Sequence, residues 1–259
     1  MKDVIDIGYL SLFAGYALLI IPIAVLWYYK TGLIKDTIIA VTRMTVQLLL
    51  VGVYLEYIFK INSYLLNVGW VFAMSIIAAY TIIKRSNLSM KLYFVPVLLS
   101  GIISIAITDA YFLGFVVDLD SIFDARYFIP ITGMLLGNTI RTVIIALDVY
   151  YGKLTSEQNY YRWHLANGAS RKEALQPFMK EALRKAFNPV IATTAIMGLI
   201  SLPGMMTGQI LGGSSPNVAI KYQIMLMITI FSSGIMNVFI TIILSNRFIF
   251  DKFDNFVQK

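Results

Sequence analysis

Seven long apolar stretches constrain the fold of this chain more than any other feature. A helix needs roughly 20 mostly apolar residues to cross the hydrocarbon core of a bilayer. Stretches of about this length cover residues 7–28, 37–59, 64–83, 92–117, 127–150, 188–213 and 219–245. Backbone polar groups in lipid must be hydrogen-bonded within the protein, which a helix achieves by itself. The pattern therefore predicts an all-α polytopic membrane protein with about seven transmembrane helices.

The composition supports this class. The chain is 58% hydrophobic and 14% charged, and its mean hydropathy is +0.75, whereas soluble domains carry roughly 25% charged residues. We assign all of residues 1–259 to a single transmembrane domain, which leaves no room for a separate soluble catalytic domain. The absence of cysteine excludes disulfides, thiolate catalysis and Cys-ligated metal sites.

The basic residues predict the orientation. Most of the 21 Lys and Arg residues fall in the loops after the first, third and fifth stretches and after the seventh. Cytoplasmic loops are enriched in these residues, so we expect the N-terminus outside and the C-terminus in the cytosol of an inner (plasma) membrane. The net charge of +7 then reflects topology, and no nucleic-acid partner is needed to explain it.

The longest polar segment, about residues 153–187, is consequently expected in the cytosol as a helical hairpin. The sequences TSEQ at Thr155 and SRKE at Ser170 fit capping boxes, which begin two helices. Gly168 is expected to end the first helix, because glycine tolerates the left-handed conformation of a helix stop.

The second helix of this hairpin has one small, apolar face, on which Ala174, Phe178, Ala182 and Ala186 recur every four residues. Pro177 predicts a kink or a delayed start. Two interpretations remain open: the hairpin either lies on the inner leaflet in contact with membrane lipid or docks on a soluble protein. The aromatic cluster beside Arg162 suits a protein pocket. The candidate docking residues are Tyr160, Tyr161, Arg162, Trp163, His164, Leu165, Asn167, Gly168, Ser170 and Arg171.

The run GASR at Gly168, followed by a helix and a membrane span, resembles the cytosolic loop of ABC transporter permeases. The run LPGMMTGQILGG from Leu202 to Gly213, with Pro216 and the pair at Tyr222 behind it, is similar to the signature of the FetB-like iron-export permeases. The likeness extends over essentially the whole chain. Importer loops carry a Glu six positions before the glycine, where this chain has Arg162.

The resemblance implies a membrane subunit of an ABC exporter of iron or another metal species. It implies a permease homodimer and a separate cytosolic ATPase subunit, which would bind ATP and Mg; this chain would bind no cofactor itself. Related plant proteins are linked to aluminium tolerance, so the resemblance does not define one cargo. A stand-alone secondary carrier and a membrane receptor or scaffold remain the alternatives.

Motifs for chemistry are missing from the sequence. It contains no phosphate-binding GxxxxGK[ST] loop and no HExxH or GxSxG motif. The single histidine is His164, in the predicted cytosolic hairpin. We therefore expect a transport subunit rather than an enzyme.

The sixth stretch combines a proline with small and polar residues. Pro203 predicts a break in its middle, as either a kinked helix or two half-helices. The stripe of Gly204, Gly208 and Gly212 predicts close approach of another helix, although contact with cargo is an alternative. Candidates for the transport pathway beside the break are Pro203, Met205, Met206, Thr207 and Gln209. Methionine pairs are also common flexible packing, so metal ligands stay unassigned.

Polar residues inside other stretches are further candidates for a pathway or a gate, because intramembrane charge is costly. They are Arg43, Gln47, Asn138, Arg141 and Asp148. We expect Arg43 to pair with Asp148 near the inner boundary, either structurally or as part of a gate. The spacing of Gly133 and Gly137 predicts a helix contact. We interpret the acids on the outer side, among them Asp109, as solvated rather than as metal ligands.

Overall fold

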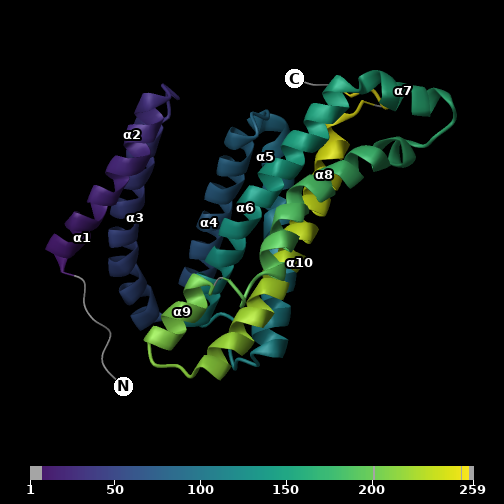
Figure 1. Cartoon of the computed structure of the whole chain (residues 1–259). Helices are drawn as coiled ribbons and strands as arrows, with labels where there is room; N and C mark the ends of the chain where they lie inside the picture. The colour runs from purple at the N-terminus through teal and green to yellow at the C-terminus, as the bar shows by residue number, and fades with distance from the viewer. Residues whose placement is uncertain (1–7, 201, 252, 257–259) are drawn as a thin grey trace. The chain divides into compact units, whose positions relative to one another are not determined.

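The computed structural model describes residues 8–200, 202–251 and 253–256, and within these it is built from helices (Figure 1). The predicted all-α class is confirmed. The chain divides into two compact units. Unit 1 consists of Met1–Ile61 and Leu211–Gly213, and unit 2 consists of Asn62–Ile210 and Ser214–Lys259.

Unit 1 contains two membrane-spanning rods. The first is formed by α1 (Tyr9–Gly15), a 3-10 turn (Tyr16–Leu19) and α2 (Ile20–Tyr28), and the second is α3 (Ile34–Ile61). The hydroxyls of Tyr16 and Thr45 are hydrogen-bonded to each other and join the two rods. Most large apolar side chains of these helices are exposed, as expected of helices that face lipid.

Unit 2 holds the main bundle, in which α4, α5, α6, α8 and α10 lie side by side (Figure 1). A π-helical turn at Phe112–Val116 follows α5. The helices of unit 2 are α4 (Tyr64–Arg85), α5 (Met90–Tyr111), α6 (Ala125–Ser156), α7 (Gln158–Ala166), α8 (Arg171–Ala195), α9 (Gly204–Leu211) and α10 (Pro216–Ile249).

Among the described residues, six helical segments are long and apolar enough to cross a membrane. They match six of the seven predicted stretches: Leu10–Tyr28, Ile34–Ile61, Tyr64–Arg85, Met90–Val116, Ala125–Ser156 and Pro216–Ile249. The remaining stretch, 188–213, is not one helix. Its first part belongs to α8, most of its last part is α9, and the described residues between them are not helical.

The interruption has a physical reason. Gly198 lies at a φ of +86°, a left-handed conformation that ends regular helix. Pro203 lacks the N–H that a continuing helix would need, and α9 begins directly after it, at Gly204. The break predicted at Pro203 is present, and the span consists of two helical pieces rather than one kinked helix.

Small polar side chains hold α5 against α10. Asn237 accepts a hydrogen bond from the Ser100 hydroxyl at 3.0 Å and another from the Thr241 hydroxyl at 3.1 Å. All three residues are buried. In a bilayer, helices associate through close packing and such hydrogen bonds, because lipid tails are as apolar as leucine.

The ends of the longest helices extend past the bilayer. At 1.5 Å per residue, the 32 residues of α6 and the 34 of α10 measure about 48 and about 51 Å, compared with a hydrocarbon core of about 30 Å. The carboxyl end of α6 reaches α7, which lies at one end of the bundle, whereas α9 lies at the other (Figure 1). The bundle therefore carries α7 outside the hydrocarbon core.

Replacing Asn237 by leucine is expected to destabilise the bundle by about 1 to 2 kcal/mol, because Ser100 and Thr241 lose their shared acceptor in an apolar medium. Thermal unfolding of the purified chain in detergent measures this. Ser232→Ala is the matched control, since Ser232 is an exposed residue of the same helix. Equal melting temperatures for the two variants would contradict the role of Asn237.

Candidate functional site

The hairpin between α6 and α8 begins later than expected. α6 continues through Thr155 to Ser156, and the Thr155 hydroxyl donates to the Tyr151 carbonyl at 2.8 Å. The predicted capping box at Thr155 is therefore wrong. The reason is packing: Leu154 is fully buried and keeps the last turn of α6 on the core. α7 begins at Gln158 instead.

The turn between α7 and α8 agrees with the sequence. Gly168 has a φ of +89°, and its N–H donates to the Leu165 carbonyl at 3.0 Å while the N–H of Ala169 donates to the His164 carbonyl at 3.1 Å. These are the two bonds of a Schellman helix end. Ser170 then caps α8 in a complete capping box with Glu173. Both predictions are confirmed.

The predicted face of α8 is also confirmed. Ala174, Phe178, Ala182 and Ala186 are all buried, and this helix packs on α6. The predicted delay at Pro177 is wrong, since the helix begins at Arg171 and continues through the proline, whose ring is exposed; a kink there stays a prediction. α8 continues beyond the expected hairpin boundary at residue 187, to Ala195.

The candidate docking residues divide into two groups. Tyr160 and Trp163 leave 45% and 59% of their surface exposed, and Arg162, Asn167, Gly168 and Ser170 are exposed as well. His164 and Leu165 are partly buried, with the His164 ring edge-on to its two aromatic neighbours. The exposed aromatic side chains of α7 are therefore the part of the candidate docking surface that is accessible to a partner.

Tyr161 belongs to the other group, since only 1% of it is exposed. Its hydroxyl donates to the Asp254 carbonyl at 2.9 Å, so Tyr161 ties the hairpin to the carboxyl-terminal segment instead of facing a partner. Burial and the nearby Asp254 carboxylate raise the pKa of Tyr161 to about 12. Arg171 joins the same contact through an ion pair with Asp254 at 3.0 Å and lies over the Phe250 ring.

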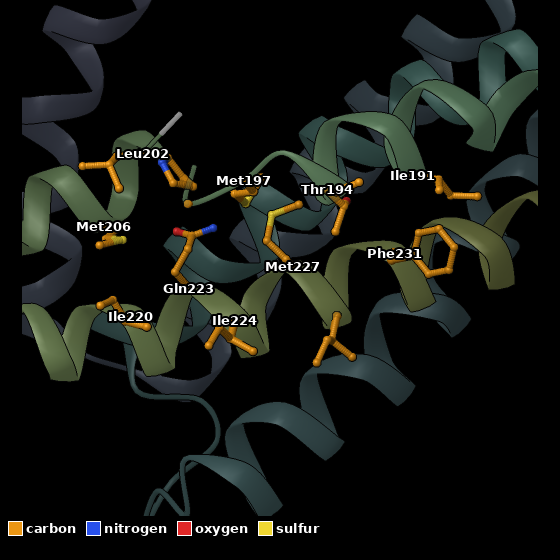
Figure 2. A pocket seen from close by; sticks show the side chains of 14 residues that line it. Ile191, Thr194, Met197, Leu202, Met206, Ile220, Gln223, Ile224, Met227 and Phe231 are labelled. Carbon is orange, nitrogen blue, oxygen red and sulfur yellow. The ribbon is translucent and has the colours of Figure 1, made fainter. Parts of the chain in front are cut away.

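The other end of α8 forms the wall of a cavity of about 750 Å³. This cavity lies between the interrupted segment and α10 (Figure 2). Its side chains are mostly apolar, with three thioethers, from Met197, Met206 and Met227. Of the predicted pathway residues, Pro203 and Met206 line it.

Gln223 and Thr194 are the polar side chains that line the cavity. The Thr194 hydroxyl donates to the Val190 carbonyl at 2.8 Å, whereas the Gln223 side chain lies between Met206 and Met227 (Figure 2). Gln223 is 8% exposed, and its Oε1 atom has no hydrogen-bond partner among the described residues. A buried acceptor without a partner is costly, so a ligand with a hydrogen-bond donor fits there. Gln223, Met197 and Met227 were not predicted; a glutamine inside an apolar stretch was the available signal.

The other residues around the break have separate surroundings. Met205 packs on the cluster around Phe112, and the Thr207 hydroxyl donates to the Pro203 carbonyl at 3.2 Å. Gln209 lies in α9, where its Oε1 is buried without a partner among the described residues. These three residues do not line the cavity.

The predicted glycine contacts are only partly visible. Gly212 lies beyond the end of α9, so it cannot continue a helical stripe with Gly204 and Gly208, and that part of the prediction is wrong. A Cβ on either of the other two would meet no atom within 4 Å. Gly133 faces the Met74 sulfur, at 3.9 Å from a Cβ placed on it, whereas Gly137 has open space. Contacts with a second copy at these glycines stay a prediction.

The polar residues of the spans do not gather at the cavity. Asn138 donates to the Met134 carbonyl at 2.9 Å. Arg141 and Asp148 are exposed on α6, as Arg43 and Gln47 are on α3. None of the ion pairs among the described residues includes these charges. Arg43 and Asp148 lie in different units, so their pairing stays a prediction.

Asp109 contradicts its interpretation as a solvated acid. It is 2% exposed and accepts a hydrogen bond from the Thr132 hydroxyl at 2.5 Å. The Asp109 side chain lines a second cavity, of about 270 Å³, between α4, α5 and α6. Tertiary packing buries it, which the sequence position near the end of a span did not reveal.

Comparison with known proteins places this arrangement in a family. Residues 9–250 match the model of an uncharacterised protein family, UPF0014. The chain belongs to the UPF0014 family. No solved structure matches it significantly. It is a multi-pass membrane protein, as the six apolar segments and the named membrane-protein relatives both indicate.

Three relatives of this UPF0014 member illustrate the range of the family. The UPF0014 membrane protein YjkA of Bacillus subtilis is 30% identical, covering 87% of this chain and 89% of the relative. The probable iron export permease protein FetB of Escherichia coli is 32% identical, covering 89% and 88%. The protein ALUMINUM SENSITIVE 3 of Arabidopsis thaliana is 33% identical, covering 82% and 77%.

The capping box at the start of α8 predicts a pH dependence. The Ser170 hydroxyl and backbone N–H donate to the Glu173 carboxylate at 2.7 and 2.8 Å and hold the pKa of Glu173 below its ordinary value of 4.5. The cap is therefore fully formed above that value and is lost as the pH falls through the lowered pKa. Carboxyl-carbon NMR titration should show the Glu173 pKa rising toward 4.5 in Ser170→Ala. An unchanged titration would contradict the capping box.

The proposed pairing of Arg43 with Asp148 has a direct test. Arg43→Asp alone should destabilise the protein in a bilayer, and Arg43→Asp combined with Asp148→Arg should recover most of the loss. The coupling energy from this cycle should be about 0.5 to 3 kcal/mol. If the effects of the two changes on thermal unfolding are additive, the predicted pairing of Arg43 with Asp148 is contradicted.

Proposed function

We propose that this chain is the membrane permease subunit of an ABC exporter, driven by a separate cytosolic ATPase. The continuity of α8 carries this proposal. The helix begins at the Ser170 cap beside α7 and ends at Ala195 in the cavity wall. At 1.5 Å per residue, its 25 residues measure about 37 Å. A displacement of the hairpin would therefore reach the cavity through one continuous helix.

The surface of α7 fits a protein partner. Its exposed side chains combine Tyr160 and Trp163 with Arg162, residue types that are enriched in protein interfaces. On its buried side, α7 is held to the carboxyl-terminal segment by the hydrogen bond of Tyr161 to Asp254. A rigid, aromatic projection outside the hydrocarbon core suits the groove of an ATPase better than a helix that lies flat on lipid.

The inferred mechanism is alternating access. Closure of two ATPase subunits on ATP would move the α7–α8 hairpins of a permease dimer, and the interrupted segment after Ala195 would change the access to the cavity. ATP and Mg would be bound by the partner. The chain itself would bind cargo and transmit movement, without covalent chemistry.

The cargo is proposed from the printed name of the Escherichia coli relative, a probable iron export permease. Among the described residues, no group of three or more His, Cys, Asp or Glu side chains could hold a metal ion. The cavity offers three thioethers, which favour soft ions, and the single unpartnered amide oxygen of Gln223, whereas iron prefers several oxygen ligands. Efflux from vesicles loaded separately with ferrous ion, an iron chelate and a soft cation identifies the cargo.

Trp163→Ala is expected to weaken binding of the partner ATPase about tenfold or more, because exposed aromatic anchors dominate the binding free energy of interfaces. Co-purification and the ATPase rate in nanodiscs containing this chain measure the effect. Trp27→Ala is the matched control, since Trp27 is exposed in α2, far from the hairpin in sequence.

Two results would contradict the proposal. If the purified chain transports cargo along an ion gradient without any ATPase, it is a secondary carrier. If it binds an ATPase through α7 but the ATPase rate does not respond and no cargo moves, it is a receptor or scaffold.

A further inference from the structure

Asp109 is a buried acid whose carboxyl group is only half satisfied. Its Oδ2 atom accepts the hydrogen bond from Thr132 on α6, whereas its Oδ1 atom has no hydrogen-bond partner among the described residues. The Ser104 hydroxyl, also on α5, is buried without a described partner as well. Asp109 therefore differs from the paired acids of the surface, such as Glu56 with Lys60.

Within the described ranges of the chain, Asp109 has no basic partner in an ion pair. None of the ion pairs among the described residues includes it. On α10, which packs along α5, the titratable residues are Lys221 and Tyr222 near its start and Arg247 near its end, and the sequence from Gln223 to Asn246 between them contains none. On α6 its neighbour is Thr132, and in the cavity the one other titratable lining residue is Tyr64 of α4. An isolated carboxylate in such surroundings carries a large desolvation cost, which a bound proton removes.

The cavity beside Asp109 has room for water but few ligands for a metal. Its volume of about 270 Å³ holds several water molecules at about 30 Å³ each. The remaining lining is apolar except for Tyr64 and Ser75, and the Ser75 hydroxyl already donates to the Val71 carbonyl at 2.9 Å. Hard cations take six or more oxygen ligands, which these side chains do not supply. A proton is the cation that fits.

Three aromatic rings line the cavity beside the loop that follows α5. The Phe123 ring lies edge-on to Tyr64 and Phe128, with centroid distances of 4.6 and 5.3 Å, and all three line the cavity. The π-helical turn that begins at Phe112 directly follows the Asp109 region of α5. Such turns replace regular helical hydrogen bonding and are frequent at functional sites. We define Tyr64, Phe123 and Phe128 as the aromatic lid.

We propose that Asp109 is a proton-binding site of this protein. The Asp109 carboxyl group is neutral while the aromatic lid is closed. When water enters the cavity, the O–H bond of the carboxyl group breaks, the proton passes to a cavity water, and the electron pair stays on the carboxylate. Proton release and uptake at Asp109 would accompany opening and closing of the bundle on this side. This inference does not depend on an ATPase or on the identity of the cargo.

Infrared spectroscopy of the full chain in lipid nanodiscs tests the proposal, with pH varied from about 5 to about 9, because the pKa of a buried carboxyl can rise to about 8 or 9. Wild-type protein should show a carbonyl band of a neutral carboxylic acid that is lost in Asp109→Asn. The band should shift in Thr132→Val, which removes the hydrogen bond but keeps the acid. Asp120→Asn, in the exposed loop, should leave the band unchanged.

Exchange with heavy water tests the route. The isotope shift of the Asp109 band should develop faster in Phe123→Ala than in wild-type protein, because the lid is missing. Equal exchange rates would overturn the lid. Wild-type and Asp109→Asn spectra that coincide at every pH, in proteins that unfold at similar temperatures, would overturn the proton site. A carboxylate band that appears in the wild type and shifts on addition of sodium or magnesium ions would also overturn it, in favour of a metal.

Discussion

The packing of α8 against α6 is the contact on which the functional arrangement depends. Three alanines and Phe178 recur every four residues along α8 and are buried at that contact. Small residues let helix backbones approach closely, which is how helices associate in a bilayer without a hydrophobic driving force. This contact holds α8 from Ala174 to Ala186, and the same continuous helix joins the hairpin at one end to the cavity wall at the other.

Features set by local chemistry could be predicted from the sequence. The φ of Gly168, the Ser170 cap and the apolar face of α8 all follow from a few neighbouring residues, and the structure reproduces each of them. Six spans follow equally from length and hydropathy. The break near Pro203 was predicted for the same reason, since a proline removes a helical hydrogen bond wherever it lies.

Features that depend on contacts between distant segments could not be predicted. Thr155 lies in a sequence that fits a cap, but the burial of Leu154 keeps α6 helical past it. Asp109 looks like a solvated acid until α4 and α6 pack over it. Gln223 reaches the cavity only because the chain folds back from α8 to α10. In each case, the neighbours that decide the role of the residue lie far away in the sequence.

The central claim is that movement passes from the hairpin through α8 to the cavity. The chain has no cysteine, so Thr194→Cys with Ile224→Cys places two spin labels across the cavity without background. Double electron–electron resonance on the spin-labelled permease with its ATPase partner in nanodiscs, with and without ATP, tests the claim directly. The account predicts a shifted distance distribution on ATP binding that Trp163→Ala abolishes. An unchanged distribution while the complex hydrolyses ATP and exports cargo would contradict it.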